Sequence, residues 1–262
     1  MTLRVGLITD IHHGPDMDTM LGTYSSDLMD KFVAEMSGRF KPDLIVDAGD
    51  RINDVDAAED MERIGRVQAR LETIRVPVLS VYGNHDMKNV GPTDQRRLRG
   101  KRGDYESLDI GGFHIVLLNS QDPSIDGLGG TISDDQVVWL DHDLRASKGP
   151  VLVFCHHPID EQHLRPHWYF SKHPEYALAV NRDRVREVLR RSGRVRAVFN
   201  GHMHWNHTGV MDGIPYVTVA SLVCCGLTNG KPGGCFAEVT VEEDRRLQVE
   251  VRGLLPMKFV YP

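Results

Sequence analysis

The chain has 262 residues, of which 40% are hydrophobic and 26% charged, as is usual for a globular protein with a large core. Its net charge of -6 argues against binding to nucleic acid polymers or to anionic membranes. No stretch offers the roughly 20 consecutive apolar residues that a membrane-spanning helix needs. Because the four cysteines have no C-x-x-C spacing and no signal peptide is evident, we expect a reduced, cytoplasmic protein.

Short apolar runs alternate with helical patterns along the chain, which predicts an α/β architecture. We expect strands at residues 3–9, 44–48, 76–82, 105–110, 113–118, 151–154 and 195–199. We expect helices at residues 27–40, 57–74, 134–144 and 182–191. Further strands at 216–220, 236–241 and 247–251 predict antiparallel sheet near the C-terminus. Because no linker or repeat interrupts this pattern, we expect one domain over residues 1–262.

Two local signals mark element boundaries. Ser133 is followed three residues later by Gln136, the spacing of a capping box at a helix start. Gly111 and Gly112 separate two predicted strands and therefore predict a hairpin turn.

Polar clusters follow five of the predicted strands at the point where each strand ends. They read "DIHH" from Asp10, "GDRIN" from Gly49, "GNHD" from Gly83, "CHHP" from Cys155 and "NGHMH" from Asn200. In sheets of this kind, ligands bind outside the carboxyl ends of the strands. The five clusters are therefore predicted to form one shared site.

The side chains of these clusters favour a metal site. The candidate ligands are two carboxylates, one amide oxygen and four imidazoles: Asp10, His12, Asp50, Asn84, His156, His202 and His204. This mixture suits divalent Mn, Fe, Co, Ni or Zn better than calcium, which prefers oxygen ligands alone. The absence of cysteine from the set argues against a closed structural zinc site. Because seven ligands exceed the needs of one ion, we expect two ions that share a carboxylate, with manganese as first choice.

The same motifs resemble those of the calcineurin-like metallophosphoesterase superfamily. Its pattern is D-x-H, G-D-x-x-(D/N), G-N-H-(D/E), H and G-H-x-H, and this chain carries the pieces in order from residue 10 to residue 204. The block from Gly201 to Leu222 looks like the branch of class III cyclic-nucleotide phosphodiesterases and glycerophosphodiesterases. The resemblance implies a four-layer αββα sandwich around two mixed β-sheets.

The resemblance also implies roles for the individual residues. Asp10, His12 and His204 would hold one metal ion, Asn84, His156 and His202 the other, and Asp50 would bridge them. His85 would contact the phosphate and protonate the leaving alkoxide. The implied reaction is in-line attack by a metal-bridging hydroxide. Asn84 and His157 are further candidates for contact with the phosphate, although plain packing of His157 is an equal alternative.

Asn53 occupies the last position of the G-D-x-x-(D/N) motif, where phosphoprotein phosphatases carry an aspartate that orients the catalytic histidine. We expect Asn53 to orient His85 without stabilising its charged form. This expectation argues against a protein phosphatase.

Three further segments have open interpretations. The basic run Arg96 to Arg102 clamps a substrate anion or forms a solvated loop, of which the loop is the commoner outcome. Residues 159–176 carry His163, His167, Trp168, Tyr169, Phe170 and His173, and we favour a lid over the metals, with packing or a dimer contact as the alternative. Cys224 and Cys225 are expected to be buried thiols and not ligands.

We therefore predict a phosphodiesterase for small soluble phosphate esters. A phosphomonoesterase or nucleotide pyrophosphatase with the same metals is the enzymatic alternative, and a non-catalytic metal-binding scaffold is the alternative of another class. The expected partner is a small-molecule phosphate ester, and a homodimer stays open.

Overall fold

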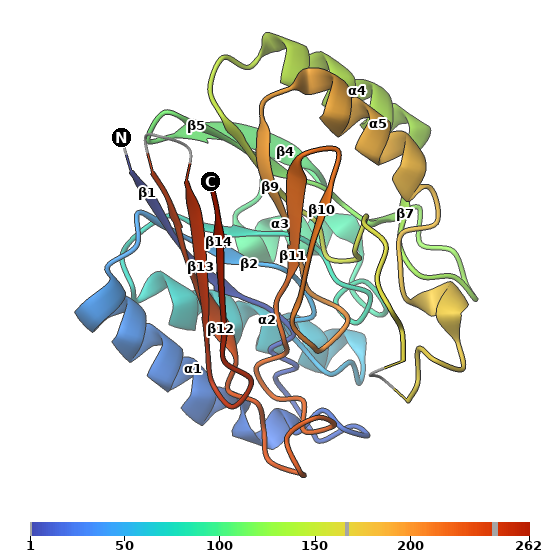
Figure 1. Cartoon of the computed structure of the whole chain (residues 1–262). Coiled ribbons are helices and arrows are strands. Elements are labelled where there is room, and N and C mark those ends of the chain that lie inside the picture. The colour runs from blue at the N-terminus through green and yellow to red at the C-terminus, as the bar shows by residue number, and fades with distance from the viewer. Residues whose placement is uncertain (1, 166–167, 243–245) are drawn as a thin grey trace.

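The computed structural model describes residues 2–165, 168–242 and 246–262. Two β-sheets lie face to face, and helices cover the outer face of each (Figure 1). This is the αββα sandwich with two mixed sheets that the sequence predicts.

The first sheet has the strand order β14-β13-β12-β1-β2-β3. Its strands are β1 (Leu3–Ile8), β2 (Leu44–Asp47), β3 (Val78–Ser80), β12 (Phe236–Val241), β13 (Leu247–Arg252) and β14 (Met257–Tyr261). Strands β1, β2 and β3 are parallel, whereas β12, β13 and β14 continue the sheet antiparallel to their neighbours. The parallel half therefore brings the carboxyl ends of three strands to one edge.

Helices α1 (Ser25–Glu35) and α2 (Ala57–Glu72) pack against the outer face of this sheet. Phe32 of α1 and Val67 of α2 belong to the same buried cluster as Ile8 and Ile45 of the sheet. Asp56 caps α2 by accepting hydrogen bonds from two backbone N–H groups of its first turn. Helix α3 (Pro92–Arg99) packs beside α2.

The second sheet has the strand order β10-β11-β9-β8-β5-β4. Its strands are β4 (Glu106–Ile110), β5 (Phe113–Leu117), β8 (Val151–Phe154), β9 (Val195–Asn200), β10 (His207–Met211) and β11 (Ile214–Thr218). Helices α4 (Asp134–Ala146) and α5 (Arg182–Ser192) cover its outer face. The short strands β6 (Gln121–Asp122) and β7 (Thr131–Ile132) form a separate pair, and η1 (Gly22–Tyr24) and η3 (Pro174–Tyr176) are single 3-10 turns.

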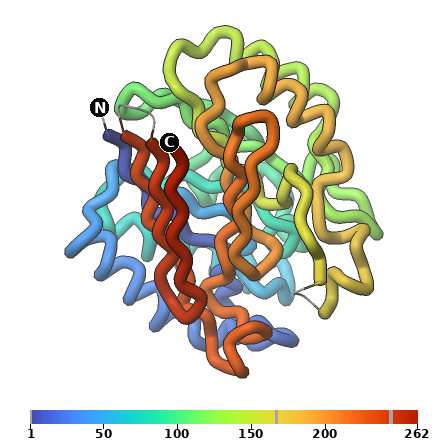
Figure 2. The backbone as a smooth tube through the Cα atoms, viewed as in Figure 1, coloured from blue at the N-terminus to red at the C-terminus, as the bar shows by residue number. Residues whose placement is uncertain are grey.

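The core between the sheets explains why these strands read as continuous apolar runs. Leu7 of β1 faces inward with Leu152 of β8 in the central cluster, while its neighbour Ile8 packs under the helices. A strand buried on both faces needs apolar residues at successive positions. The two ends of the chain meet at one end of the first sheet, because Leu3 pairs with Val241 and Tyr261 with Leu247 (Figure 2).

Several boundaries differ from the prediction. The helix expected at 27–40 ends at Glu35 and continues as a π-helical turn (Met36–Phe40). Ser133 does cap α4, but the Gln136 side chain bonds Asn119 and Asp122, so the reciprocal half of the capping box is missing. The hairpin at Gly111 is confirmed. Strands β10 and β14 were not predicted, and β11 is parallel to β9 as well as antiparallel to β10.

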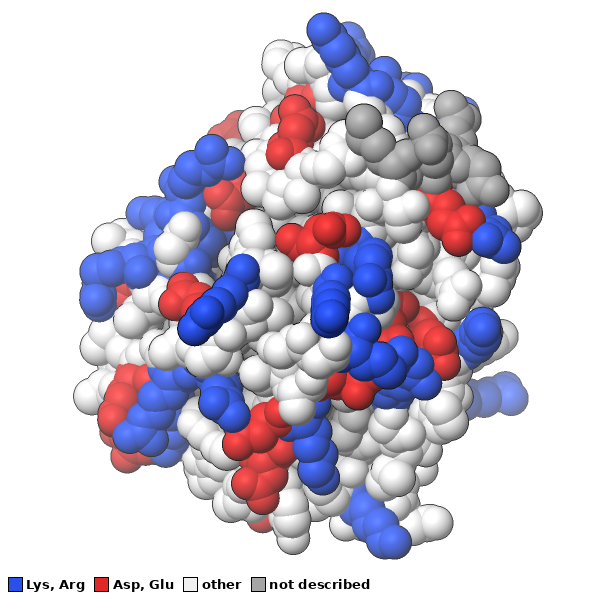
Figure 3. Space-filling model, turned by 90° about the vertical axis from the view of Figure 1, so that its left-hand side faces the viewer, with Lys and Arg blue, Asp and Glu red and all other residues white. Residues whose placement is uncertain are grey.

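Acidic and basic side chains are interspersed over the face of the molecule shown in Figure 3. Many of them form ion pairs along helices, such as Arg66 with Glu62 on α2 and Arg190 with Glu187 on α5. Such exposed pairs contribute little stability individually. No helix among the described residues is long and apolar enough to cross a membrane.

Candidate metal centre

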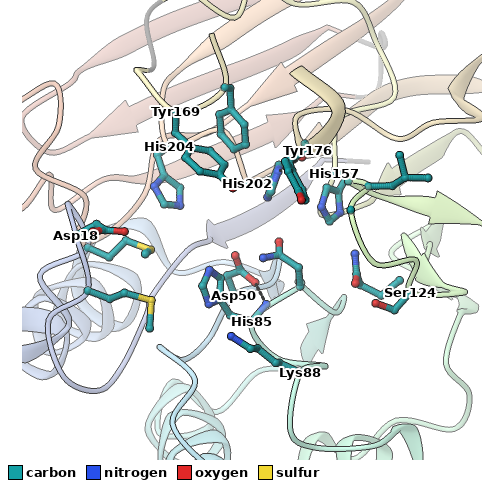
Figure 4. A pocket seen from close by; sticks show the side chains of 18 of the residues that line it. Asp18, Asp50, His85, Lys88, Ser124, His157, Tyr169, Tyr176, His202 and His204 are labelled. Atoms are coloured by element: carbon teal, nitrogen blue, oxygen red, sulfur yellow. Dashed lines mark hydrogen bonds between the residues drawn. The ribbon is translucent and has the colours of Figure 1, made fainter. Parts of the chain in front are cut away.

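The loops that follow five parallel strands carry the predicted ligands to one rim of the sandwich. They are Asp10 and His12 after β1, Asp50 after β2, Asn84 after β3, His156 after β8, and His202 and His204 after β9. Figure 4 shows Asp50, His85, His202 and His204 around one cavity. The structure therefore brings together side chains that are up to 194 positions apart in the sequence, between residues 10 and 204.

These loops have an unusual backbone. Ten non-glycine residues of the described chain have positive φ, and five of them are predicted ligands: Asp10, His12, Asp50, His202 and His204. A left-handed conformation is unfavourable for residues with a Cβ atom, and it persists where the surrounding structure enforces it, often at functional sites. The backbone is thus strained at the point where the ligand loops converge.

Two glycines allow the ligand loops to approach one another. A Cβ atom on Gly83 would lie 2.1 Å from Oδ1 of Asp50, and one on Gly201 would lie 2.6 Å from Oδ2 of Asp10. Only glycine fits at such distances from a neighbouring side chain. The glycines of the GNHD and GHMH motifs are therefore required by the packing of the carboxylates.

The first ligand group contains Asp10, His12 and His204, which are all buried. Nε2 of His204 lies 3.2 Å from Oδ1 of Asp10 and 3.1 Å from Nε2 of His12. One ligand atom from each residue lies within 4.8 Å of the others, a spacing that fits coordination of a single ion.

The second group contains Asp50, His156 and His202, again within 4.8 Å. Nε2 of His156 lies 3.2 Å from Oδ2 of Asp50. The same Oδ2 atom lies 4.0 Å from Nε2 of His12 in the first group. Asp50 is therefore placed between the two groups, as a bridging carboxylate would be.

Unpartnered polar atoms identify what these groups can bind. Oδ1 of Asn84 and Nε2 of His156 are buried without hydrogen-bond partners. Burying such atoms is costly unless something binds them. Nδ1 of His156 donates to the Ala48 carbonyl at 2.8 Å, and this bond fixes the tautomer that leaves Nε2 free as a ligand. Oxygen and imidazole donors in this arrangement fit two divalent transition-metal ions.

Electrostatics divides the histidines into two kinds. Burial lowers the pKa of His12 and of His202 to about 3, so both are neutral at physiological pH, as metal-binding imidazoles must be. Burial also opposes the charging of His156, but the adjacent Asp50 raises its pKa to about 9. Burial opposes ionisation of Asp50, and His156 and His85 nevertheless hold its pKa well below the ordinary value. Asp50 is therefore an anion.

His85 follows Asn84 and faces the same cavity. Its Nδ1 lies 2.6 Å from Oδ1 of Asp54, and Nζ of Lys88 lies 2.9 Å from the other oxygen of Asp54. Burial lowers the pKa of His85, but Asp50 and Asp54 outweigh it and raise the pKa above the ordinary value. Asp50 and Asp54 therefore favour the protonated form of the imidazole.

The prediction that Asn53 orients His85 is wrong. The Asn53 amide donates to the Pro15 carbonyl at 2.8 Å, and no hydrogen bond joins it to His85 among the described residues. Asp54, one position further along, takes the orienting role. The motif spacing pointed to Asn53, the third residue after Asp50, whereas the structure presents the fourth, Asp54, to the histidine.

A cavity of about 500 Å³ opens above the ligands. Its wall includes four aromatic side chains from the segment 159–176: Trp168, Tyr169, Phe170 and Tyr176. Two methionines of the loop after His12, Met17 and Met20, also line it. Lys88 is the one lysine or arginine of the described chain that lines it. Met17, Met20 and Lys88 could not be predicted from the sequence, because none belongs to a motif.

Two residues of the segment 159–176 contact His202 of the second ligand group. Nε2 of His202 donates to the Tyr176 carbonyl at 2.8 Å, and the ring of Phe170 lies 5.0 Å from that of His202. His157 also lines the cavity, where its Nδ1 pairs with the Ser120 hydroxyl at 2.9 Å. His167 lies outside the described residues.

The basic run from Arg96 to Arg102 is neither a clamp on the cavity nor a solvated loop. Its first four residues belong to α3, and Arg99 is buried in an ion pair with Asp86 at 2.9 Å. Arg96 pairs with Asp104, and Lys101 with Glu106. The run is therefore structural, and it supports the GNHD loop from beneath.

Comparison with known proteins agrees with this geometry. The family model for calcineurin-like phosphoesterases matches residues 3–206, more than half of the chain. The chain belongs to the calcineurin-like phosphoesterase family. It is thereby a phosphoric ester hydrolase by family.

Relatives within the family carry two kinds of name. A probable cyclic nucleotide phosphodiesterase of Fibrobacter succinogenes is 28% identical over 223 residues, which cover 82% of this chain and 78% of the relative. The human serine/threonine-protein phosphatase CPPED1 is 27% identical over 216 residues, which cover 78% of this chain and 66% of the relative. A dimetal phosphatase from Danio rerio shares the fold with a TM-score of 0.78 at 20% identity, over 99% of both chains.

Proposed function

We propose that this family member is a two-metal phosphodiesterase for small soluble substrates of the cyclic nucleotide or glycerophosphodiester type. One observation carries the proposal: Asp50 of the second ligand group lies 4.0 Å from His12 of the first, and His85 lines the cavity beside both groups. The relative from Fibrobacter succinogenes that is named as a probable phosphodiesterase is in keeping with it.

The proposed ligands divide between two ions. Asp10, His12 and His204 would hold one ion, Asn84, His156 and His202 the other, with Asp50 shared. Divalent ions bound there would lower the pKa of coordinated water from 15.7 towards about 7 and polarise a phosphoryl oxygen. Manganese is our first choice, with iron, zinc, cobalt and nickel as alternatives, because all accept mixed imidazole and carboxylate donors.

His85 is proposed to protonate the leaving oxygen. Asp54 holds its Nδ1, so Nε2 remains to face the cavity as the donor. A positioned acid of this kind accelerates departure of a basic alkoxide by about 10²- to 10⁴-fold. Asn84 and His157, which line the cavity on either side, are proposed to contact the phosphate.

The cavity wall is proposed to select the substrate. With Lys88 as the one lysine or arginine of the described lining, and that cation paired to Asp54, the site suits a single phosphate better than a polyphosphate. The rings of Tyr169 and Tyr176 offer an apolar face to a substituent of the ester. The segment 159–176 would thus act as a selective wall over the metals.

A phosphomonoesterase is the second candidate, and one observation favours it. The carboxylate that the resemblance assigns to phosphoprotein phosphatases is present as Asp54, so the objection drawn from Asn53 no longer holds. Relatives named as serine/threonine-protein phosphatase fit this alternative.

The two candidates separate in one assay. Protein stripped with a chelator and reloaded with Mn²⁺ is offered bis(p-nitrophenyl) phosphate, p-nitrophenyl phosphate, 2′,3′- and 3′,5′-cyclic nucleotides, glycerophosphodiesters and phosphoserine peptides. We expect no hydrolysis by the stripped form, recovery with Mn²⁺, and a larger kcat/KM for diesters than for monoesters. The reverse preference would favour the second candidate. A metal-loaded protein that hydrolyses none of these esters would indicate a binding scaffold.

A further inference from the structure

Two neighbouring histidines follow β8, and the first of them, His156, belongs to a ligand group. Nδ1 of His156 donates to the Ala48 carbonyl at 2.8 Å, so its Nε2 carries a lone pair that can bind a metal ion. His157 lines the cavity but belongs to none of the ligand groups among the described residues. What its ring offers to a substrate depends on which of its two nitrogens carries the proton.

The partner of His157 is the hydroxyl group of Ser120. Oγ of Ser120 lies 2.9 Å from Nδ1 of His157, and it also accepts the backbone N–H of His157 at 3.2 Å. Ser120 is 0% exposed and His157 is 1% exposed. One buried hydroxyl group therefore makes two contacts with the same histidine.

The direction of the bond to the ring follows from the capacity of the hydroxyl group, which has one proton to donate and can accept two hydrogen bonds. The backbone N–H of His157 uses one acceptor position of Ser120. The Cys155 thiol is also close to this hydroxyl, but a thiol sulfur is a weak acceptor. A buried hydroxyl proton without a good acceptor is costly, so Ser120 donates to Nδ1 of His157. The imidazole is then neutral, and its proton lies on Nε2.

Two further neighbours hold the ring of His157. It packs against the ring of His202, with 4.0 Å between the centroids. A Cβ atom on Gly130 would lie 2.6 Å from Cγ of His157, so only glycine leaves room for the ring. Figure 4 shows His157 on the wall of the cavity. Because Ser120 occupies Nδ1, Nε2 is the ring nitrogen that remains to face a substrate.

We propose that Ser120 is a positioning residue, which holds His157 in the tautomer that donates a hydrogen bond from Nε2 to an oxygen of the substrate phosphate. The inference rests on the proposed function and extends it to a residue outside the five polar clusters. Phosphate oxygens are strong acceptors, so a lone pair on Nε2 would repel them. Opposite partners thus make one imidazole a metal ligand and its neighbour a phosphate donor: a carbonyl for His156 and a hydroxyl for His157.

The tautomer is measured directly by NMR. Histidine is labelled with ¹⁵N, and the ring nitrogens are observed in the metal-free and in the zinc-loaded protein. The signals of His157 are those that His157→Gln removes. We expect wild type to carry a proton on Nε2 and none on Nδ1. In Ser120→Ala the preference should be lost, so that both tautomers are populated.

Binding of phosphate measures the consequence. Mn²⁺-loaded wild type, Ser120→Ala and Ser124→Ala are compared with bis(p-nitrophenyl) phosphate as the substrate and inorganic phosphate as a competitive inhibitor. We expect Ser120→Ala to raise KM and the inhibition constant of phosphate by about 3- to 10-fold, with a smaller change in kcat and the full metal content. Ser124 is the matched control, because it lines the same cavity without a hydrogen bond to His157 among the described residues.

A double-mutant cycle separates positioning from packing. The amide of His157→Gln donates from about the place of Nε2 and does not depend on a tautomer. Adding Ser120→Ala to this variant should therefore raise the inhibition constant of phosphate no further. A rise as large as in the wild-type background would show that Ser120 acts through packing alone, and it would overturn the positioning role.

The remaining outcomes separate the inference from the proposed function. A proton on Nδ1 of His157 in wild type, alone or together with one on Nε2, would overturn the role of Ser120 even in an active enzyme. Equal inhibition constants of wild type and Ser120→Ala would overturn it as well. A protein with the expected tautomer that hydrolyses no ester would overturn the proposed function alone, and calorimetry with inorganic phosphate would then measure the effect of Ser120→Ala.

Discussion

Two clusters of buried charge lie at the same end of the first sheet, and they are neutralised in different ways. Beneath the ligand loops, Arg51 and Arg99 are buried with Asp47 and Asp86, two cations with two anions. Above them, the carboxylates Asp10 and Asp50 are surrounded by imidazoles and no arginine or lysine of the described chain pairs with either. The lower cluster is therefore balanced by permanent charge and the upper one by protons.

This difference explains which cluster is built to bind something. Arginine stays charged at all physiological pH values, so the charges of the lower cluster balance without a ligand. In the upper cluster, Asp50 draws a proton onto His156, whose pKa rises to about 9 despite burial. A metal ion replaces such protons, because it needs deprotonated ligands. Negative charge that is balanced by exchangeable protons, and not by arginine or lysine, is thus a physical signature of the proposed metal centre.

Asp86 connects the two clusters. Its carboxylate accepts hydrogen bonds from the backbone N–H groups of Asp50, Arg51 and Gly83 at 2.9–3.0 Å. On its other side it pairs with Arg99 of α3. The lower cluster therefore holds the two loops from which the upper one is built.

Removing the shared carboxylate should have the largest effect. In Asp50→Asn, both ligand groups lose their common anion, so we expect loss of both ions. The two ions supply several kcal/mol of transition-state stabilisation, so kcat/KM should fall by about 10³-fold or more. Elemental analysis after gel filtration measures the metal. Asp18→Asn, at an exposed position of the cavity rim, is the control and should keep both ions. Two ions retained by the Asp50 variant would contradict bridging.

Breaking the lower cluster should lower the free energy of unfolding, whereas breaking the upper one lowers metal affinity. Arg99→Met leaves Asp86 buried beside Asp47 with one cation fewer, and removing one partner of a buried pair costs about 3–5 kcal/mol. Urea unfolding of the metal-free protein measures this loss. Arg97→Met on the same helix removes only an exposed pair with Asp94 and should cost about 1 kcal/mol or less. Equal costs for the two variants would show that the cluster is not needed for stability.

Changing the partner of His85 should affect catalysis without affecting metal binding. Asp54→Asn removes the carboxylate that raises the pKa of His85, so the alkaline limb of kcat/KM should move to lower pH. Turnover should fall by about 10- to 100-fold, less than the loss from His85→Ala. The metal content should equal that of wild type. Asn53→Asp serves as the comparison, since Asn53 bonds Pro15 and not His85.

If the pH profile of the Asp54→Asn variant equals that of wild type, Asp54 does not orient His85. A Lys88→Met control separates the two partners of Asp54, because it leaves the bond to His85 in place.

The contrast between the clusters also explains what could be predicted from the sequence. The ligands were predictable because each follows an apolar run at a strand end, and strand ends converge. Asp54 was not, because the motif does not show which residue of the loop after Asp50 reaches His85. Arg99 looked like part of a solvated run, since nothing local shows that its helix packs over Asp86.

The smallest expected effect concerns a histidine that pairs with carboxylates, as the arginines of the lower cluster do, but whose charge depends on a proton that it can lose. His114 of β5 lies between Asp109 and Asp143, at 2.7 and 2.8 Å. Burial lowers its pKa, but the two carboxylates raise it above the ordinary value of 6.5. Because the folded-state pKa is the higher one, the protonated ring stabilises the fold fully below pH 6.5, and this contribution is lost as the pH rises through the folded-state pKa.

His114→Gln should therefore be less stable than wild type at pH 5.5, by on the order of 1 kcal/mol. The difference should shrink at pH 9, where the ring of the wild type is neutral. Urea unfolding at both values measures it. His142→Gln on α4 is the control, because His142 takes part in none of the ion pairs among the described residues. A difference that is constant with pH would mean that His114 contributes through packing alone, and that proton-based balance is confined to the metal pocket.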